Sequence, residues 1–367
     1  MKERGFISKY GLFATIIVTV VGVGVFSLPN TMANEVGTDG WFVVIFAGVI
    51  CFLLLGLIHR VVVQNDYNTF YSMLEGNLGN ILGKIFGIII CGYFIISVAL
   101  GMRVFAEVIK MYLLEQTPTE FILLVMIFTG LYLVRGDLSS LIKFNEISLF
   151  AMFIPIVIIL MFATRGGYLT NVLPLLQSKP EQYIKALATA TYAFGGFEIV
   201  YLVLPYMKDK NGIKTTFFKS IAVITIFYVL VIVLCLMFFS KEHTKTLLWP
   251  TITLIRAIVI PGAFIERWEG IVMSLWVLFY FTTFVNMYYF SGDIIKEVFR
   301  LRDIKLSSCI LAPFIYIIAL YPQNIAEVYD TSGKVIPILS VFSFVILPLT
   351  LLFASKLKER GRKHNEV

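Results

Sequence analysis

Two of the long apolar segments in this sequence are interrupted by glycine at matching places. The first reads Gly22-Val23-Gly24-Val25-Phe26-Ser27-Leu28-Pro29, and the second reads Phe194-Gly195-Gly196-Phe197-Glu198. Glycine is a poor helix former, and within a bilayer a broken backbone persists only where it lines a cavity or is buried in protein. Such breaks in both halves of a chain predict a small-solute site near the middle of the membrane.

The composition is that of an integral membrane protein. Hydrophobic residues make up 59% of the 367 residues and charged residues only 14%, whereas soluble domains carry roughly 25% charged residues. The four cysteines, Cys51, Cys91, Cys235 and Cys309, are isolated and lack the spacing of a zinc site or a disulfide framework. We therefore expect them to act as small packing residues.

Ten segments are long and apolar enough to cross a bilayer, which takes about 20 residues. They lie near residues 8–34, 41–63, 84–113, 118–134, 145–164, 183–207, 215–240, 267–293, 306–321 and 335–355. Residues 68–82 have an apolar stripe and predict an amphipathic helix at the interface. Residues 247–260 are too short for a span and predict a surface or re-entrant helix. The sequence thus predicts an all-α membrane protein with ten transmembrane helices.

Lysine and arginine lie mostly in the loops on one side of these spans, and the first two loops on the other side contain neither residue. This bias predicts that both termini, including the basic tail 356–367, face the cytoplasm. Residues 1–367 then form one membrane domain of two five-helix repeats, 8–164 and 183–355. Because each repeat has an odd number of spans, the second repeat must be inverted relative to the first.

Each glycine break is expected to turn two half-helix ends towards the middle of the membrane. Free N–H groups at a helix N-terminus suit a carboxylate, and the carbonyls of the preceding half-helix suit an ammonium group or a cation. A zwitterion such as an amino acid satisfies both ends, while a sugar or nucleoside could use them with less electrostatic benefit. The alternative is that the glycines only permit close helix packing.

Glu198 is an acid within a span that is otherwise uncharged from Ala186 to Met207, and an intramembrane acid suggests a functional role. Three roles remain open: a ligand for a substrate ammonium, a proton carrier, or an acceptor for the unpaired N–H groups of the broken first span. Arg103 and Glu107 are four residues apart and predict a buried ion pair; a part in an outer gate is the alternative.

Two further stripes at helical spacing are candidate pocket walls, although such stripes are often packing surfaces. One contains Tyr93 and Ser97 and the other contains Thr283. The predicted substrate-binding residues are Gly22, Val23, Gly24, Val25, Phe26, Tyr93, Ser97, Phe194, Gly195, Gly196, Phe197, Glu198 and Thr283. The sequence has no phosphate-binding glycine loop, nucleophile–base pair or metal-ligand cluster. We therefore expect no enzyme activity, no metal and no cofactor.

The two glycine motifs resemble the first- and sixth-span motifs of the amino acid–polyamine–organocation (APC) transporter superfamily. Trp249-Pro-Thr-Ile-Thr-Leu254 and Pro261-Gly-Ala-Phe-Ile-Glu-Arg267 resemble outer-loop motifs of the spore germination permeases, the B subunits of germinant receptors. The resemblance covers essentially the whole chain. It implies a LeuT-like fold of two inverted five-helix repeats with discontinuous helices one and six. It also implies a place in the inner membrane of the bacterial spore, with an A subunit and a lipoprotein C subunit as partners.

In that family the B subunit is regarded as the germinant sensor. The resemblance therefore implies a subunit that binds a small nutrient, most readily an amino acid, and signals to its partners. Some proton-coupled relatives carry a lysine in span five, whereas residues 147–164 contain no ionisable group. This difference argues against proton-coupled uptake by that route. An amino acid permease that transports its substrate independently is the alternative function.

Overall fold

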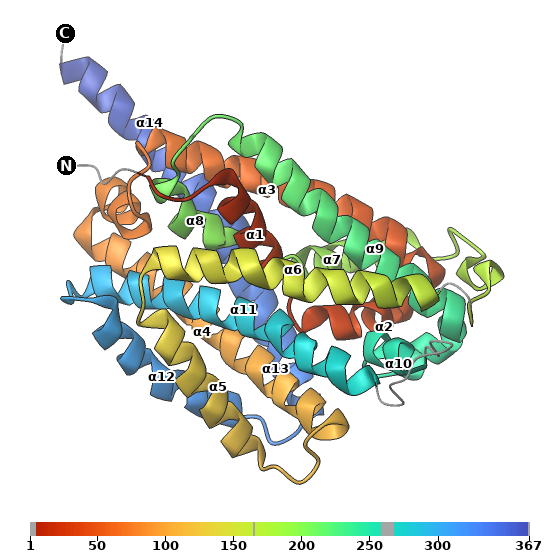
Figure 1. Ribbon diagram of the computed structural model, residues 1–367. Helices are drawn as coiled ribbons and strands as arrows, with labels where there is room; N and C mark the ends of the chain where they lie inside the picture. The colour runs from red at the N-terminus through yellow and green to blue at the C-terminus, as the bar shows by residue number, and fades with distance from the viewer. Residues whose placement is uncertain (1–4, 164–165, 258–267, 366–367) are drawn as a thin grey trace.

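The computed structural model describes residues 5–163, 166–257 and 268–365, and these form a bundle of long helices (Figure 1). Within these ranges the only extended pairing is an isolated bridge between Ile7 and Met207. Both chain termini lie at one end of the bundle, which we call the terminal end. The other end is called the opposite end.

The first half of the chain contains five predicted spans, the first of which is broken. Its helices are α1 (Lys9–Val20), α2 (Gly24–Val36), η1 (Gly37–Asp39), α3 (Gly40–Gln64), α4 (Phe70–Tyr112), α5 (Thr119–Val134) and α6 (Leu138–Ala163). α4 bends at Gly79, whose φ is 79°. This bend separates the predicted amphipathic helix from the third span.

The second half repeats this order with another broken span at its start. Its helices are η3 (Leu169–Val172), α7 (Pro180–Tyr192), η4 (Phe197–Ile199), α8 (Val200–Val203), η5 (Leu204–Tyr206), α9 (Ile213–Thr246), α10 (Pro250–Ala257), α11 (Trp268–Val298), α12 (Ile304–Leu320), α13 (Ile325–Val341), η6 (Phe342–Ile346) and α14 (Leu347–Asn365). The short α10 is the helix predicted within 247–260. The tenth span begins earlier than predicted, at Ile325, because Asn324 caps the helix by accepting from the N–H of Glu327 at 3.0 Å.

Every predicted span has a helical counterpart in this order. Among the described residues, five continuous helical runs are long and apolar enough to cross a bilayer, and α7 with η4–η5 forms a sixth, bent by 42° at its break. The shorter apolar helices include α1, α5 and α12. In Figure 1 the chain runs from the terminal end through α1 and α2, but towards the terminal end through α7 and α8. The two broken spans are therefore antiparallel.

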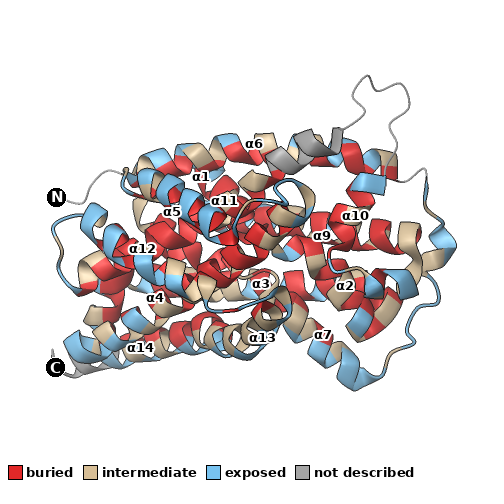
Figure 2. Ribbon diagram, turned by 90° about the horizontal axis from the view of Figure 1, so that it is seen from below, coloured by how far each residue is buried: buried red, intermediate tan, exposed pale blue. Residues whose placement is uncertain are grey.

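Buried residues fill the centre of the bundle and exposed residues cover its sides (Figure 2). The exposed side chains are themselves largely apolar; Leu53, Phe128 and Met161 are examples, each more than 60% exposed. A surface of this kind suits contact with lipid chains. The exterior thus agrees with the membrane class that the composition predicts.

A buried polar cluster joins α1, α6 and α11, and sequence reasoning did not identify it. The Asn145 amide donates to the Asn286 carbonyl oxygen at 2.8 Å and to the Thr15 hydroxyl at 3.1 Å. The Asn286 amide donates in turn to the Thr19 hydroxyl at 2.8 Å. All four side chains are at most 1% exposed. The cluster fixes α1 against the two helices beside it.

We expect Asn145→Val and Asn286→Val each to lower stability, because each leaves the other amide buried without its partner. Each single change should cost about 0.6–1.7 kcal/mol, the range for interhelical hydrogen bonds in membranes. The double variant should lose less than the sum of the two, since both ends of the bond are then apolar. Thermal unfolding of the purified variants measures this; strictly additive losses would contradict a coupled pair.

Candidate functional site at the two helix breaks

The first break lies between the end of α1 at Val20 and the start of α2 at Gly24. Its two glycines differ in their surroundings. A Cβ atom on Gly22 would lie 2.8 Å from the Thr283 hydroxyl oxygen, so Gly22 serves close packing against α11. A Cβ atom on Gly24 would meet nothing within 4 Å, and Gly24 is exposed although it lies between two core helices. A hollow therefore borders the first break at Gly24.

The second break needs glycine for its backbone conformation. Gly196 has a φ of 109°, which side chains of L-residues rarely allow. A Cβ atom there would also lie 3.1 Å from the carbonyl oxygen of Thr19. The backbone of the second break thus packs directly on the end of α1.

The carbonyls freed at the breaks are already hydrogen-bonded within the protein. The hydroxyls of Thr282 and Thr283 donate to the carbonyls of Val18 and Thr19, both at 2.9 Å. In a bilayer such carbonyls would otherwise lack a partner. Each of these carbonyls therefore already has a partner inside the protein and does not depend on an ammonium group for one.

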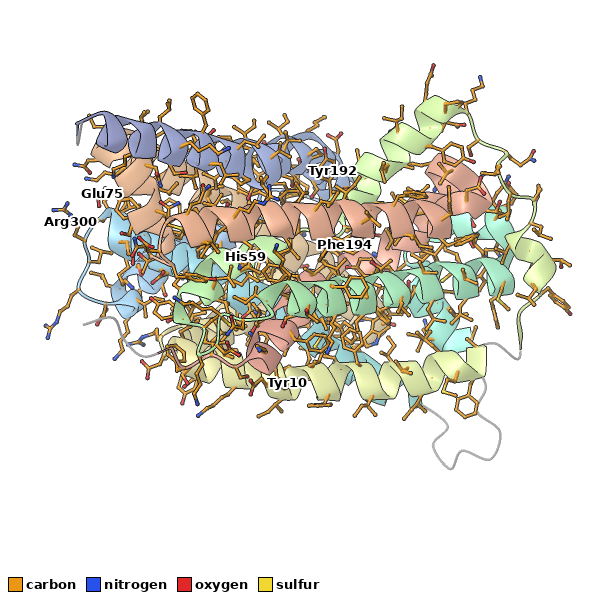
Figure 3. All side chains as sticks on the ribbon, turned by 90° about the horizontal axis from the view of Figure 1, so that it is seen from above. Tyr10, His59, Glu75, Tyr192, Phe194 and Arg300 are labelled. Carbon is orange, nitrogen blue, oxygen red and sulfur yellow. The ribbon has the colours of Figure 1, made fainter. Side chains whose placement is uncertain are left out.

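Tyr228 of α9 connects the two breaks directly. Its hydroxyl lies 3.2 Å from the carbonyl oxygen of Val20 and 3.1 Å from that of Ala193. The ring of Phe194 packs edge-on against the Tyr228 ring, with 5.3 Å between centroids, and Figure 3 places Phe194 midway along the bundle. Tyr228 was not predicted, because nothing in its local sequence marks it.

Glu198 stabilises its own break. Its carboxylate accepts from the N–H of Gly196 at 2.7 Å and from the Ser343 hydroxyl at 3.2 Å, and it also hydrogen-bonds to the Tyr93 hydroxyl. Glu198 was expected, in one of its three possible roles, to accept from N–H groups of the broken first span. Its carboxylate instead accepts from the N–H of Gly196, which belongs to the sixth span. The difference arises because η4 turns the carboxylate back onto the N–H two residues earlier.

Only some of the predicted substrate-binding residues are accessible to a solute. Gly24 is exposed, and Val23, Ser97, Gly195 and Thr283 are partly exposed. The other predicted residues are buried: Gly22, Val25, Phe26, Tyr93, Phe194, Gly196, Phe197 and Glu198. Buried members such as Phe197, whose ring centroid is 4.7 Å from that of Phe344, support the backbone. The accessible members lie around both breaks and could touch a solute.

The accessible hydroxyls of Ser97 and Thr283 present acceptors. Ser97 donates its hydrogen to the carbonyl of Tyr93 at 2.7 Å, and Thr283 donates to that of Thr19. Each oxygen then keeps lone pairs for a donor. At the start of α2 the N–H groups of Val25 and Phe26 donate to the carbonyls of Gly22 and Val23, at 3.4 and 3.0 Å, and among the described residues the N–H of Gly24 has no partner. The start of α2 thus offers a donor, and the two hydroxyls offer acceptors.

At the opposite end, α10 is hydrogen-bonded to α2, the second half of span one. The Thr251 hydroxyl donates to the carbonyl of Val25 at 2.8 Å, and the Trp249 indole donates to the Tyr329 hydroxyl at 3.0 Å. Tyr329 also hydrogen-bonds to Ser27 of α2. These bonds explain the Trp249–Leu254 motif; the motif at 261–267 lies outside the described residues.

Aromatic rings fill the space between the breaks and the terminal end. The Phe70 ring lies 5.0 Å from that of Tyr201 and 5.3 Å from that of Phe290, between centroids. Phe94 packs on Phe290 at 5.1 Å. All four side chains are at most 2% exposed. They close the bundle on the side of the chain termini.

The predicted ion pair lies in the opposite half of α4, away from the breaks. Arg103 Nε is 3.3 Å from a Glu107 carboxylate oxygen, and the Arg103 guanidinium also donates to the carbonyl of Gln323 at 3.2 Å. Arg103 is 7% exposed. The pair therefore links α4 to the start of α13.

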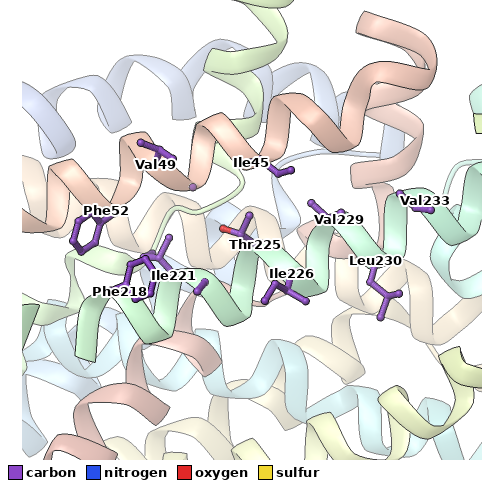
Figure 4. A pocket seen from close by; sticks show the side chains of 12 residues that line it. Ile45, Val49, Phe52, Phe218, Ile221, Thr225, Ile226, Val229, Leu230 and Val233 are labelled. Atoms are coloured by element: carbon purple, nitrogen blue, oxygen red, sulfur yellow. The ribbon is translucent and has the colours of Figure 1, made fainter. Parts of the chain in front are cut away.

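A groove of about 590 Å³ between α3 and α9 is a poor candidate for a polar solute (Figure 4). Ile45, Val49 and Phe52 line it from α3, and Thr225 is the one polar side chain among its lining residues. Its outer side chains belong to the apolar exterior; Ile226, for example, is 67% exposed. The groove therefore opens on the apolar exterior of the bundle.

Comparison with known proteins agrees with this architecture. Residues 6–328 match the spore permease family model, which is described as spore germination protein. The chain belongs to the spore germination permease family. It is 30% identical to "Spore germination protein A2" of Bacillus subtilis (strain 168) over 93% of both chains. It is 29% identical to "Spore germination protein YndE" of the same strain, over 95% of this chain and 97% of that protein.

The fold of the chain is also similar to that of a solved structure. It is a substrate-bound, outward-open Na⁺-coupled sialic acid symporter, with a TM-score of 0.66, 10% sequence identity, and coverage of 94% of this chain and 80% of that chain. At this identity the likeness concerns the fold alone. The chain therefore has the LeuT-like fold of two inverted five-helix repeats, with helices one and six discontinuous, as predicted.

The two breaks should respond differently to alanine. We expect Gly24→Ala to leave expression and thermal stability unchanged, because its Cβ enters open space. Gly196→Ala should cost about 1–3 kcal/mol, the range for a residue held in a disfavoured backbone region. Thermal unfolding of the two purified variants measures the difference. Equal losses at both positions would contradict the hollow at Gly24.

Proposed function

We propose that this chain is the nutrient-sensing subunit of a spore germinant receptor and that the nutrient binds at the hollow beside Gly24. The observation that carries the proposal is the contrast between Gly24 and the rest of the breaks. Other polar groups described there have partners inside the protein, whereas Gly24 borders open space at the start of a helix. Such a place suits a small polar solute.

An amino acid fits the distribution of donors and acceptors. Its carboxylate would accept from the N–H of Gly24 at the start of α2, where the helix dipole also favours negative charge. Its ammonium would donate to the accessible oxygens of Thr283 and Ser97. Glu198 is not needed for this contact, since Gly196, Ser343 and Tyr93 already occupy its carboxylate. Glu198 would instead hold the second break in shape.

Sensing is favoured over independent transport by two features. The aromatic rings around Phe70 close the bundle towards the terminal end. Span five offers no ionisable group from 147 to 164 that could couple uptake to protons. Binding would then change the contacts of α2 and α10 and be passed to partner subunits. An amino acid permease acting alone is the second candidate, supported by the transporter fold.

Four further assignments belong to this proposal. The partners would be a receptor A subunit and a lipoprotein C subunit, and the location would be the inner membrane of the spore. Both termini would face the cytoplasm, with 356–367 as a basic tail. The repeat boundaries would be 8–164 and 183–355. They rest on the family membership and on the charge bias of the loops.

A larger side chain at Gly24 should abolish binding without unfolding the protein. We expect one or more standard amino acids, tested in turn, to raise the melting temperature of the purified wild type. In Gly24→Leu the side chain fills the hollow and this rise should disappear. Gly56→Leu of α3 is the matched control, because a Cβ there also meets nothing within 4 Å. A normal rise in Gly24→Leu would show that the site is elsewhere.

The same amino acid, radiolabelled, separates the two functions in proteoliposomes of the isolated chain. A sensor should bind it without concentrating it inside the vesicles, under either a proton or a sodium gradient. Concentrative uptake would overturn the sensing proposal in favour of the permease. A rise with sugars or nucleosides only would retain the site and replace its ligand.

A further inference from the structure

A second cavity, of about 520 Å³, lies between the start of α1 and the start of α9. Lys9, Tyr10 and Phe13 line it from α1, and Thr215, Thr216 and Lys219 line it from α9. Both helices begin at the terminal end, so the cavity lies at that membrane face (Figure 1). It is separate from the hollow at the breaks.

The polar part of this cavity is positively charged. Lys9 Nζ lies 2.7 Å from a carboxylate oxygen of Asp209. The hydrogen bond from Lys9 holds the pKa of Asp209 below its ordinary value, so this acid is ionised and offsets part of the charge of Lys9. Lys219 forms no salt bridge with any residue in the described ranges. Lys219 therefore provides an uncompensated positive charge.

The groups around the lysines are hydrogen-bond donors. Thr215 is exposed, and α9 begins after Gly212 without a side-chain cap. The nearest acid on α6 is Glu146, which accepts from the Ser8 hydroxyl at 3.2 Å. Glu146 does not line the cavity. A phosphate oxygen would thus meet ammonium and hydroxyl donors.

The side of the cavity towards the membrane interior is aromatic. The ring of Tyr10 lies 5.9 Å from that of Phe150, nearly parallel, and 6.3 Å from that of Phe13. Tyr10 is 38% exposed and Phe150 is 56% exposed. Figure 3 shows Tyr10 beside the yellow helix α6 on the outside of the bundle. Cationic groups at the membrane face with apolar rings below them match the two ends of a phospholipid.

We propose that this cavity binds the headgroup of an anionic phospholipid. The phosphate lies between Lys219 and Lys9 and accepts from the Thr215 hydroxyl, while an acyl chain runs along Phe13 and Phe150. A free phosphate ion would use the lysines but not the aromatic side of the cavity. Basic pockets between transmembrane helices at the cytoplasmic face are suited to such headgroups.

This lipid would hold α1 against α9. The far end of α1 supplies the carbonyls of Val18, Thr19 and Val20 at the first break, and Tyr228 of α9 bonds to the last of them. A bridge at one end of the two helices therefore steadies the break at the other end. The lipid site itself does not depend on the proposed nutrient site.

Binding can be measured on the full-length purified chain in detergent. We expect phosphatidylglycerol to raise the melting temperature more than phosphatidylcholine does at equal concentration. Lys219→Gln should weaken the phosphatidylglycerol response about fivefold in lipid concentration, since a lysine near an anionic headgroup contributes about 1 kcal/mol. Thr215→Val, which keeps the size of the side chain, should weaken it to a smaller degree. Lys305→Gln is the matched control, an exposed lysine that does not line this cavity.

Three outcomes would overturn the proposal. The first is an equal response to both lipids, and the second is an unchanged response in Lys219→Gln. The third is a Lys219-dependent response to sodium phosphate as large as that to phosphatidylglycerol, which would assign the cavity to a soluble anion. A loss in Lys219→Gln and Thr215→Val, with Lys305→Gln unchanged, supports the lipid site.

Discussion

The structure depends on the need to satisfy the backbone groups of two broken helices inside a bilayer, where no water can do so. The protein meets this need with side chains from other spans. Thr282 and Thr283 bind the carbonyls at the end of α1, Tyr228 binds carbonyls of both breaks, and Glu198 binds the N–H of Gly196. Breaks held in this way become fixed parts of the core, with their chains antiparallel.

The hydrogen bonds that satisfy the backbone groups of the breaks also determine which polar groups remain available to a solute. The acid and the α1 carbonyls already have partners inside the protein, so the groups that would remain for a solute are the N–H of Gly24 and the oxygens of Ser97 and Thr283. α10 is bonded to α2, and aromatic rings pack between the breaks and the terminal end. A ligand at Gly24 would therefore act first on α2 and, through it, on α10.

The sequence predicted the features that are local to a segment. The ten spans, both breaks, the amphipathic helix and the short helix at 250–257 follow from apolar length, glycine and helix periodicity. The partners of the breaks could not be predicted, because Tyr228 lies 208 residues from Val20 and Asn286 lies 141 residues from Asn145. For Glu198 the sequence identified a buried acid, while the turn in η4 decided which N–H it binds.

The central claim, that the nutrient occupies an accessible hollow at Gly24, can be tested by cysteine accessibility. Cys51, Cys91 and Cys235 are buried, so Cys309→Ser removes the exposed thiol. Gly24→Cys in that background should react with a small polar thiol reagent, and the stabilising amino acid should slow the reaction. An introduced thiol that does not react, or that is labelled at the same rate with and without the amino acid, would contradict the account.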